Sequence, residues 1–258
     1  RVAAAQLRAG GVVAFPTETV YGLGAHAFDA RAVRAIFRAK GRPADNPLIV
    51  HVADALMVER VARRVPVMAR RLMDRFWPGP LTVIVPRHAS VPDEVTAGLD
   101  TVGVRWPAHP VAQAFLQACA VPVAAPSANR SGRPSPTTWT AVVEEMSGRI
   151  PCILRGGPAE VGLESTVVDC TGRRPVVLRQ GAITLEQVRS VVASAVVADH
   201  AAPGDAPVRS PGLKYRHYAP NAVVVLVRSA AEIPAGMTAC GFIGTMPEGL
   251  RRSWIGQL

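Results

Sequence analysis

The sequence predicts an α/β or α+β domain with a mixed sheet. Short apolar runs bounded by glycine and proline alternate with stretches whose apolar residues recur at helical spacing. Hydrophobic residues make up 49% of the chain, which is ample for a core and excludes global disorder. With 258 residues, the chain is long enough for one large domain or for a main domain with an appendage.

The first half of the chain gives a local reason for each expected element. The apolar run 12–15 lies between two glycines and Pro16, as a buried strand does. Asp29 can cap a helix that ends at Lys40, and Gly41 lets that helix stop. The other expected elements here are a strand at 48–52, a helical stretch at 55–76 interrupted near Pro66, and a strand at 81–85.

The second half continues the alternation with shorter strands. Thr184 and Gln187 form a capping-box pattern, which predicts a helix running to about residue 197. Glycine-rich turns separate the last three candidate strands. The remaining expected elements are strands at 102–105, 121–125, 153–154, 165–169 and 176–179, and helices at 107–119 and 138–146.

The composition changes after Ala198, so we expect three parts. Residues 1–198 form the main domain, and 199–221 form a linker because they are rich in proline, glycine and charge and lack apolar periodicity. Residues 222–258 begin a second strand-led unit that is too short to be independent, and we expect an incomplete C-terminal α/β domain. Beside two tyrosines, the linker carries three cations or imidazoles, namely Lys214, Arg216 and His217.

The formal net charge of +10 favours polyanionic partners such as nucleotides or RNA. The excess is mostly arginine scattered along the chain, so either a compositional bias or nucleic-acid contact explains it. The four cysteines show no CxxC spacing, which favours small buried side chains over a metal site. No apolar run approaches ~18 residues and no signal-peptide pattern is present, so we expect a soluble, cytoplasmic protein without membrane association.

The run 40–51 places cations on a connection that Pro43 and Pro47 stiffen. Lys40 supplies a compact charge and Arg42 a planar fork that can grip phosphate oxygens. This pattern predicts an anionic ligand. The alternative is a solvated helix end whose dipole favours basic residues.

Hydroxyl groups follow two of the expected strands. Thr17 and Thr19 would point to the same side of an extended segment, and the glycines at 22 and 24 would admit a ligand close to the backbone. The alternative is a polar strand end with a glycine turn. Ser127 and Asn129 lie just past a buried strand, where α/β sheets place ligand contacts, although such loops often have no function.

The remaining polar residues favour positioning chemistry over hydrolysis. Arg105 and Arg179 lie at strand ends, and two arginines in one cleft need an anion to balance them. Ordinary surface salt bridges are the alternative. The sequence has no Walker, dinucleotide-binding, HExxH, GxSxG or paired-carboxylate pattern. A pocket of cations, hydroxyls and amides suits adenylyl transfer, which needs orientation and charge stabilisation.

These motifs together resemble the YrdC-like family of L-threonylcarbamoyladenylate synthases, in the extended form with a C-terminal domain. The resemblance spans about residues 5–220, in the family's order, although 222–258 are shorter than that domain normally is. It implies a twisted, open, mixed α/β sheet with a large basic cavity, followed by a small Rossmann-like domain. The matching segments are 16–24, 40–51, 125–132, 164–167, 179–181 and 210–220.

The resemblance implies that L-threonine, bicarbonate or CO₂, and ATP give threonylcarbamoyl-AMP and pyrophosphate, for threonylcarbamoyladenosine modification of tRNA. It implies catalytic roles for Lys40 and Arg42, with Mg²⁺ held mainly by the ATP phosphates and no protein metal ligands. The implied threonine-binding residues are Thr19, His51, Arg105, Ser127 and Ser165. The implied ATP-binding residues are Arg42, Asn46, Thr101, Asn129, Thr137, Arg179 and Tyr218, the last on a linker that would close over the cavity.

Two other functions compete with this one. A basic RNA-binding module regulated by nucleotide fits the charge but not the uncharged hydroxyl and amide groups. A carbamoyl-transfer domain of the hydrogenase-maturation kind usually comes with zinc-finger-like cysteines, which the sequence lacks. If the protein is a synthase of this family, we also expect tRNA-modifying partner proteins and weak binding of tRNA or other RNA.

Overall fold

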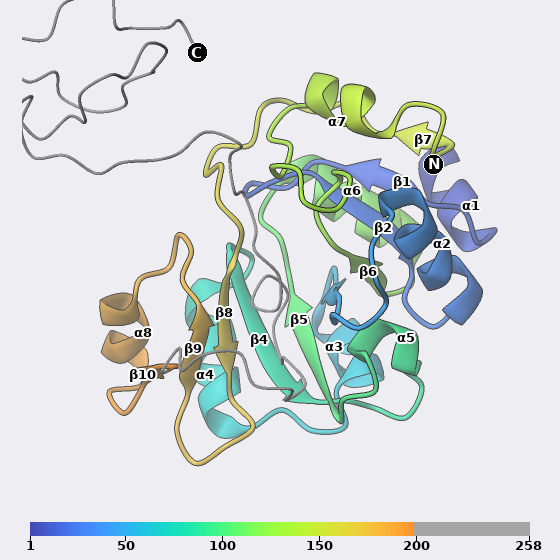
Figure 1. Cartoon of the computed structure of the whole chain (residues 1–258). Helices are drawn as coiled ribbons and strands as arrows, with labels where there is room; N and C mark the ends of the chain where they lie inside the picture. The colour runs from blue at the N-terminus through green and yellow to red at the C-terminus, as the bar shows by residue number, and fades with distance from the viewer. Residues whose placement is uncertain (199–258) are drawn as a thin grey trace, which may run out of the picture. The chain divides into compact units, whose positions relative to one another are not determined.

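The computed structural model describes residues 1–198 of the chain (Figure 1). The strands are β1 (Val13–Phe15), β2 (Gly22–His26), β3 (Ile49–His51), β4 (Leu81–Pro86), β5 (Thr101–Arg105), β6 (Val123–Ala125), β7 (Cys152–Ile153), β8 (Thr166–Asp169), β9 (Val176–Arg179) and β10 (Val196–Val197). The helices are α1 (Val2–Arg8), α2 (Ala30–Lys40), α3 (Ala55–Val61), α4 (Val67–Phe76), α5 (Asp93–Thr96), α6 (Pro110–Cys119), α7 (Trp139–Met146) and α8 (Leu185–Val191).

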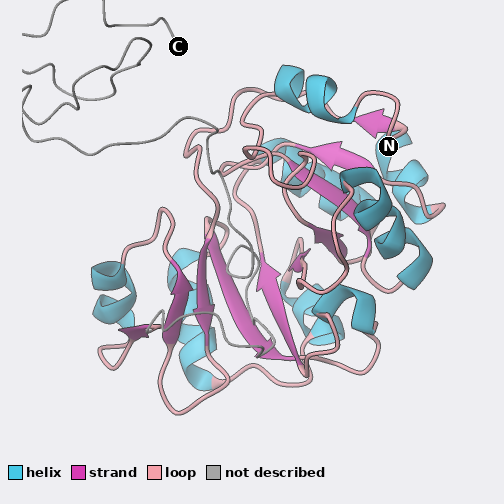
Figure 2. Ribbon diagram, viewed as in Figure 1, coloured by secondary structure: helices cyan, strands magenta, loops and turns pink. Residues whose placement is uncertain are grey.

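The strands form an open, mixed sheet, as expected from the alternation of elements and the family resemblance. The strand order, which was not predicted, is β10-β9-β8-β4-β5-β3-β6-β2-β1-β7. Strand pairs β4–β8, β3–β5, β1–β7 and β9–β10 are parallel, and the other neighbours are antiparallel. Figure 2 shows helices packed against this sheet, with α4 against β4 and α2 against β2. No helix within residues 1–198 is long and apolar enough to cross a membrane.

Helix α2 has the ends that the sequence predicted. The Asp29 side chain accepts hydrogen bonds from the backbone amides of Arg31 and Ala32, which have no partner inside the helix. Gly41 ends the helix in the left-handed conformation at φ 61°, which glycine adopts without strain. The last residue of α2, Lys40, is therefore held at a defined place.

The alternative of a glycine turn at 22–24 does not apply, because these residues form strand β2. A Cβ on Gly24 would lie 2.7 Å from Val123 Cγ1 and 2.9 Å from Phe15 Cε1. The bare backbone at Gly24 therefore makes room for side chains of the neighbouring strands. Close packing inside the sheet accounts for Gly24, whereas Gly22 is among the residues that line the cavity.

The end of the last predicted helix is also wrong. The capping box of Thr184 and Gln187 is present, but α8 stops at Val191. The chain then forms β10, which pairs in parallel with β9 at one edge of the sheet. The amide of Ala198 donates to the carbonyl of Val177 at 2.9 Å, so the sheet edge satisfies backbone groups that a longer helix would have used. Helices α1 and α5 were not predicted, and the expected linker 199–221 and second unit 222–258 lie outside the described residues.

Candidate functional site

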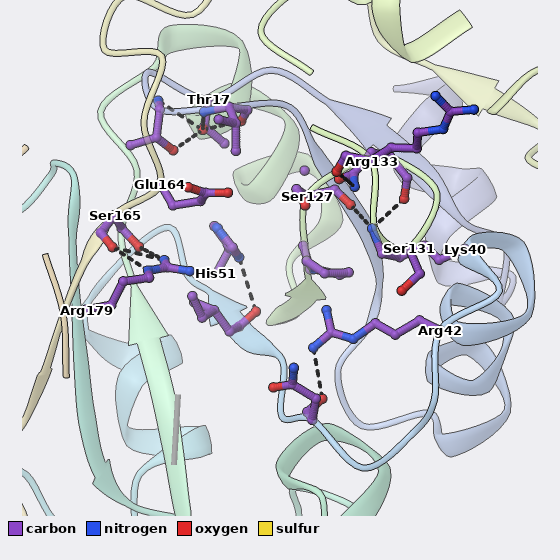
Figure 3. A pocket seen from close by; sticks show the side chains of 18 of the residues that line it. Thr17, Lys40, Arg42, His51, Ser127, Ser131, Arg133, Glu164, Ser165 and Arg179 are labelled. Carbon is purple, nitrogen blue, oxygen red and sulfur yellow. Dashed lines mark hydrogen bonds between the residues drawn. The ribbon is translucent and has the colours of Figure 1, made fainter. Parts of the chain in front are cut away.

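The cavity lies where the ends of several strands meet the end of α2 and the loop after β6 (Figure 3). Its volume is about 380 Å³, within the usual range for a small-molecule site of roughly 300–1,000 Å³. Side chains from two sides face each other across it. One side, which we call the α2 wall, is formed by Lys40, Arg42, Ser127, Ser131 and Arg133, together with Asn129, whose carbonyl accepts from Lys40. The other side, which we call the strand-end wall, is formed by Thr17, His51, Glu164, Ser165 and Arg179, together with Arg105, which pairs with His51 in the sheet, and Thr19, which accepts from Arg105.

Lys40 is buried at the α2 wall and ties α2 to the loop after β6. Its Nζ donates hydrogen bonds to the carbonyl oxygens of Ser127 and Asn129, both at 2.5 Å. Burial, helped by the nearby charge of Arg42, lowers the pKa of Lys40 to about 7, against an opposing contribution from Glu145. The side chain therefore titrates near neutral pH. The alternative of a solvated helix end does not apply to Lys40.

This pKa gives the stability of the ligand-free protein a dependence on pH. Because the pKa is about 7 in the folded protein and 10.5 ordinarily, the unfolded chain binds more protons between these values. We therefore expect the free energy of unfolding to rise with pH from about 7 to 10.5, by a few kcal/mol at most, since one pKa unit corresponds to about 1.4 kcal/mol. Denaturant unfolding of wild type and Lys40→Met at pH 7 and pH 9.5 checks this. An equal change in both proteins contradicts it.

Arg42 braces the loop that follows α2. Its Nη2 donates to the carbonyls of Asn46 at 3.1 Å and Pro47 at 3.3 Å, and its guanidinium lines the cavity. The head group is thereby held in one orientation, as bidentate recognition of phosphate requires. The predicted phosphate-binding run thus places two cations on one wall.

The strand-end wall follows from the register of the sheet. His51 pairs with Arg105 across the parallel strands β3 and β5, so both side chains project from the same face. The Oγ atoms of Thr82, on the adjacent β4, and Ser165, just before β8, are 2.7 Å apart. Burial, followed by the charge of Arg105, lowers the pKa of His51 to about 3, so its imidazole is neutral at physiological pH.

Arg105 forms an ion pair with a carboxylate that was not among the predicted site residues. Its Nη2 lies 2.7 Å from Glu18 Oε1, and its Nη1 donates to Thr19 Oγ1 at 2.8 Å. Both charged side chains are buried, at 5% and 8% exposed. Despite the short distance, neither Glu18 oxygen accepts a well-aligned hydrogen bond from the described residues. The contact is an ion pair that offsets the charge of Arg105.

The segment around Glu18 is a turn, so the expected extended conformation is wrong. Thr17 Oγ1 donates a hydrogen bond to the Val20 carbonyl oxygen at 2.6 Å and lies 2.9 Å from Thr19 Oγ1. The two hydroxyls are neighbours, as predicted, but the turn brings them together instead of strand alternation. It also points Glu18 toward Arg105 and away from the cavity lining.

Arg179 holds the backbone that carries Glu164 and Ser165. Its Nε and Nη2 donate to the Ser165 carbonyl at 3.1 and 2.9 Å, and Nη2 also reaches Ser165 Oγ at 3.1 Å. Burial lowers the pKa of Arg179 to about 10. A Cβ on Gly181 would lie 2.3 Å from the Glu164 carbonyl oxygen and 2.6 Å from the Thr166 amide nitrogen. Glycine at 181 is therefore required for this packing.

The cavity unites most of the predicted site residues. It brings together Lys40, Arg42, Asn46, His51, Arg105, Ser127, Asn129, Ser165, Arg179 and Thr19. Thr137 is not among the lining residues, and Thr101 lies at the opposite end of β5 from Arg105, so their predicted contacts with ATP stay predictions. Tyr218 lies outside the described residues.

Several residues of the site were not predicted from the sequence. Ser131, Arg133 and Glu164 line the cavity, and Glu18 lies behind Arg105. A lone acid between two threonines, and another directly before Ser165, were the available signals for Glu18 and Glu164. Five of the cavity's side chains are cationic, which agrees with the expected basic cavity: Lys40, Arg42, Arg105, Arg133 and Arg179.

Comparison with known proteins agrees with the fold and the motifs. The Sua5/YciO/YrdC family model, described as "Telomere recombination", matches residues 5–181. A second model, described as "Threonylcarbamoyl-AMP synthase, C-terminal domain", matches residues 183–246. Curated threonylcarbamoyl-AMP synthases from Pyrococcus abyssi and Bacillus subtilis are 50% and 49% identical over 230 and 231 residues, or 88% and 89% of this chain.

A solved structure is similar over nearly the same range. The crystal structure of Sua5 from P. abyssi complexed with L-threonine has a TM-score of 0.83 and 50% sequence identity over 86% of this chain. The chain spans 67% of the length of both curated relatives and 65% of that solved chain. The chain therefore belongs to the Sua5/YciO/YrdC family.

Proposed function

We propose that this protein is a threonylcarbamoyl-AMP synthase, which converts L-threonine, bicarbonate or CO₂, and ATP into threonylcarbamoyl-AMP and pyrophosphate. One observation carries the proposal: a single cavity joins a cationic wall to a wall of hydroxyl, imidazole and guanidinium groups. That combination suits a nucleotide beside a small amino acid. The relatives of that name, about half identical in sequence, support the same reaction.

The reaction needs charge stabilisation more than covalent participation by the protein. The threonine amine takes up CO₂ to form a carbamate, and a carbamate oxygen attacks the α-phosphorus of ATP as pyrophosphate leaves. Negative charge develops on the phosphate oxygens, where Arg42 provides a fixed cation on the α2 wall; the phosphate charge would raise the pKa of Lys40 and keep that side chain protonated beside it. Arg179, across the cavity, supplies a third. Threonine is then held against Thr19, His51, Arg105 and Ser165, with Ser127 opposite.

We propose that Mg²⁺ enters with ATP and is held mainly by the phosphates. Residues 1–198 contain no group of three or more His, Cys, Asp or Glu side chains that could hold a metal ion. The described lining offers a single carboxylate, so phosphate oxygens would be the main ligands. When bound, Mg²⁺ neutralises phosphate charge.

We further propose that the product passes in the cytoplasm to partner proteins, which transfer the threonylcarbamoyl group to an adenosine beside the anticodon of certain tRNAs. The net charge of +10 supports weak contact with tRNA. It does not by itself favour an RNA-binding module without turnover, because the cavity combines its cations with hydroxyl and imidazole groups arranged around a small-molecule volume.

The test is turnover by the purified full chain with ATP, Mg²⁺, labelled bicarbonate and L-threonine. We expect pyrophosphate release that requires threonine, together with label in a nucleotide-linked product. Omitting threonine should reduce pyrophosphate release to background. Salt-sensitive RNA binding without any threonine-dependent turnover would overturn the proposal and favour the RNA-binding module.

A further inference from the structure

Glu164 is the only carboxylate among the cavity-lining residues that the structure describes. Figure 3 shows its side chain reaching into the cavity between the Thr17 turn and His51. Its Oε1 accepts a hydrogen bond from Ser135 Oγ at 2.7 Å, and Gly181 packs against its carbonyl oxygen. Backbone and side chain are thus both held, so the carboxylate is presented at a fixed place on the strand-end wall.

A carboxylate in a cationic cavity suits a ligand that brings a positive charge of its own. An amino acid does so through its ammonium group, which the five cations of the lining would otherwise repel. The ion pair with Glu18 offsets the charge of Arg105, so the strand-end wall is the less positive of the two. The ammonium group is therefore attracted to Glu164, while the basic side chains of the α2 wall attract the phosphates of the nucleotide.

The other titratable groups near this wall are poor proton acceptors or face elsewhere. The His51 ring makes a hydrogen bond to the Ile49 carbonyl, and its low pKa makes it a weak base. Glu18 lies behind Arg105 and is not part of the lining. Lys40 is on the opposite wall, where it donates to two carbonyl groups.

We propose that Glu164 binds the ammonium group of the substrate amino acid and takes a proton from it, so that the amine can attack CO₂. This inference rests on the proposed function. The N–H bond breaks and the proton moves to the Glu164 carboxylate, which leaves a neutral amine. The nitrogen lone pair forms the N–C bond to CO₂, an electron pair of one C=O bond moves to oxygen, and a second N–H proton leaves to solvent. The resulting carbamate is the nucleophile for ATP, and Glu164 returns its proton to solvent.

The test compares full-length wild type with Glu164→Gln, which keeps the shape and removes the charge. We expect kcat/KM for L-threonine to fall by at least roughly 10²-fold, in the range of general-base losses, with KM for ATP within about twofold. Glu160→Gln is the matched control, because Glu160 is exposed in the same loop and does not line the cavity. It should behave as wild type.

The pH profile separates proton removal from a structural role. As pH rises from 7 to 9.5, more threonine arrives as the neutral amine, so the ratio of wild-type to Glu164→Gln activity should shrink. A ratio that stays constant with pH overturns the proposal, as does a variant with wild-type kcat/KM for threonine.

Binding by the wild-type protein provides a measurement that does not depend on a variant folding. L-threonine should bind at least tenfold more tightly than 2,3-dihydroxybutanoate, which carries a hydroxyl in place of the ammonium. Equal affinity overturns the role of Glu164 as the ammonium acceptor. If wild type shows no threonine-dependent pyrophosphate release, the proposed function has failed, whereas active wild type with unaffected Glu164→Gln rejects only the inference about Glu164.

Discussion

Replacing Arg42 with alanine should lower kcat/KM for ATP by roughly 10²- to 10³-fold while the protein stays folded. The guanidinium lines the α2 wall and is held by the carbonyls of Asn46 and Pro47, so it is oriented before any phosphate arrives. Alanine removes both the charge and the planar fork. Steady-state kinetics with varied ATP, together with the melting temperature, measure the two effects separately.

Two further variants sharpen this prediction. Arg42→Lys keeps the charge but not the bidentate geometry, so it should recover only part of the lost activity. Arg38→Ala is the control, because Arg38 lies exposed on the same helix and does not line the cavity. Turnover by folded Arg42→Ala that matches the Arg38→Ala control would remove Arg42 from the proposed phosphate contacts.

Glu18→Gln should cause the largest loss of stability among the variants considered. It leaves the buried Arg105 charge without its counterion, and breaking a buried pair in this way costs about 3–5 kcal/mol. For a chain of this size, the melting temperature should fall by roughly 10 °C. Thermal and denaturant unfolding measure the loss.

The ion pair of Arg87 and Asp93 offers a matched control for Glu18→Gln. It has the same N–O distance of 2.7 Å, but the Asp93 side chain is 71% exposed. Asp93→Asn should therefore cost about 1 kcal/mol or less. Adding Arg105→Met to Glu18→Gln removes the unpaired charge and should restore part of the stability. Similar losses for Glu18→Gln and Asp93→Asn would contradict burial as the source of the effect.

Local sequence patterns predicted those helices and strands whose ends are set by residues close in sequence. Asp29 and Gly41 bound α2 as expected, because capping depends only on residues within one turn. The open, mixed sheet was also foreseen, but its strand order was not, since β4 pairs with β8 across many intervening residues. Strand β10 was missed for the same reason. Its two residues are a strand only because β9 lies beside them.

The same distinction between local and distant interactions applies to the site residues. The motifs identified Lys40 and Arg105 as functional candidates, but each partner of these side chains is distant in the sequence. Lys40 bonds to Ser127 and Asn129, and Arg105 pairs with Glu18. The burial that lowers the pKa of Lys40 and the ion pair that offsets the charge of Arg105 arise only when these segments come together, so no single segment of sequence contains them. Only the assembled fold distinguishes the two walls.

The pairing of His51 with Arg105 makes the spacing of the strand-end wall a property of the backbone. Neighbouring strands are about 4.8 Å apart, and their ladder hydrogen bonds resist any change in that interval. Exchanging one side chain therefore cannot change the distance between the backbone positions that carry His51 and Arg105. Adaptation to a bulkier amino acid would therefore have to come from the loop that faces the ladder, at 126–133, which makes this loop the region to randomise in any redesign of substrate choice.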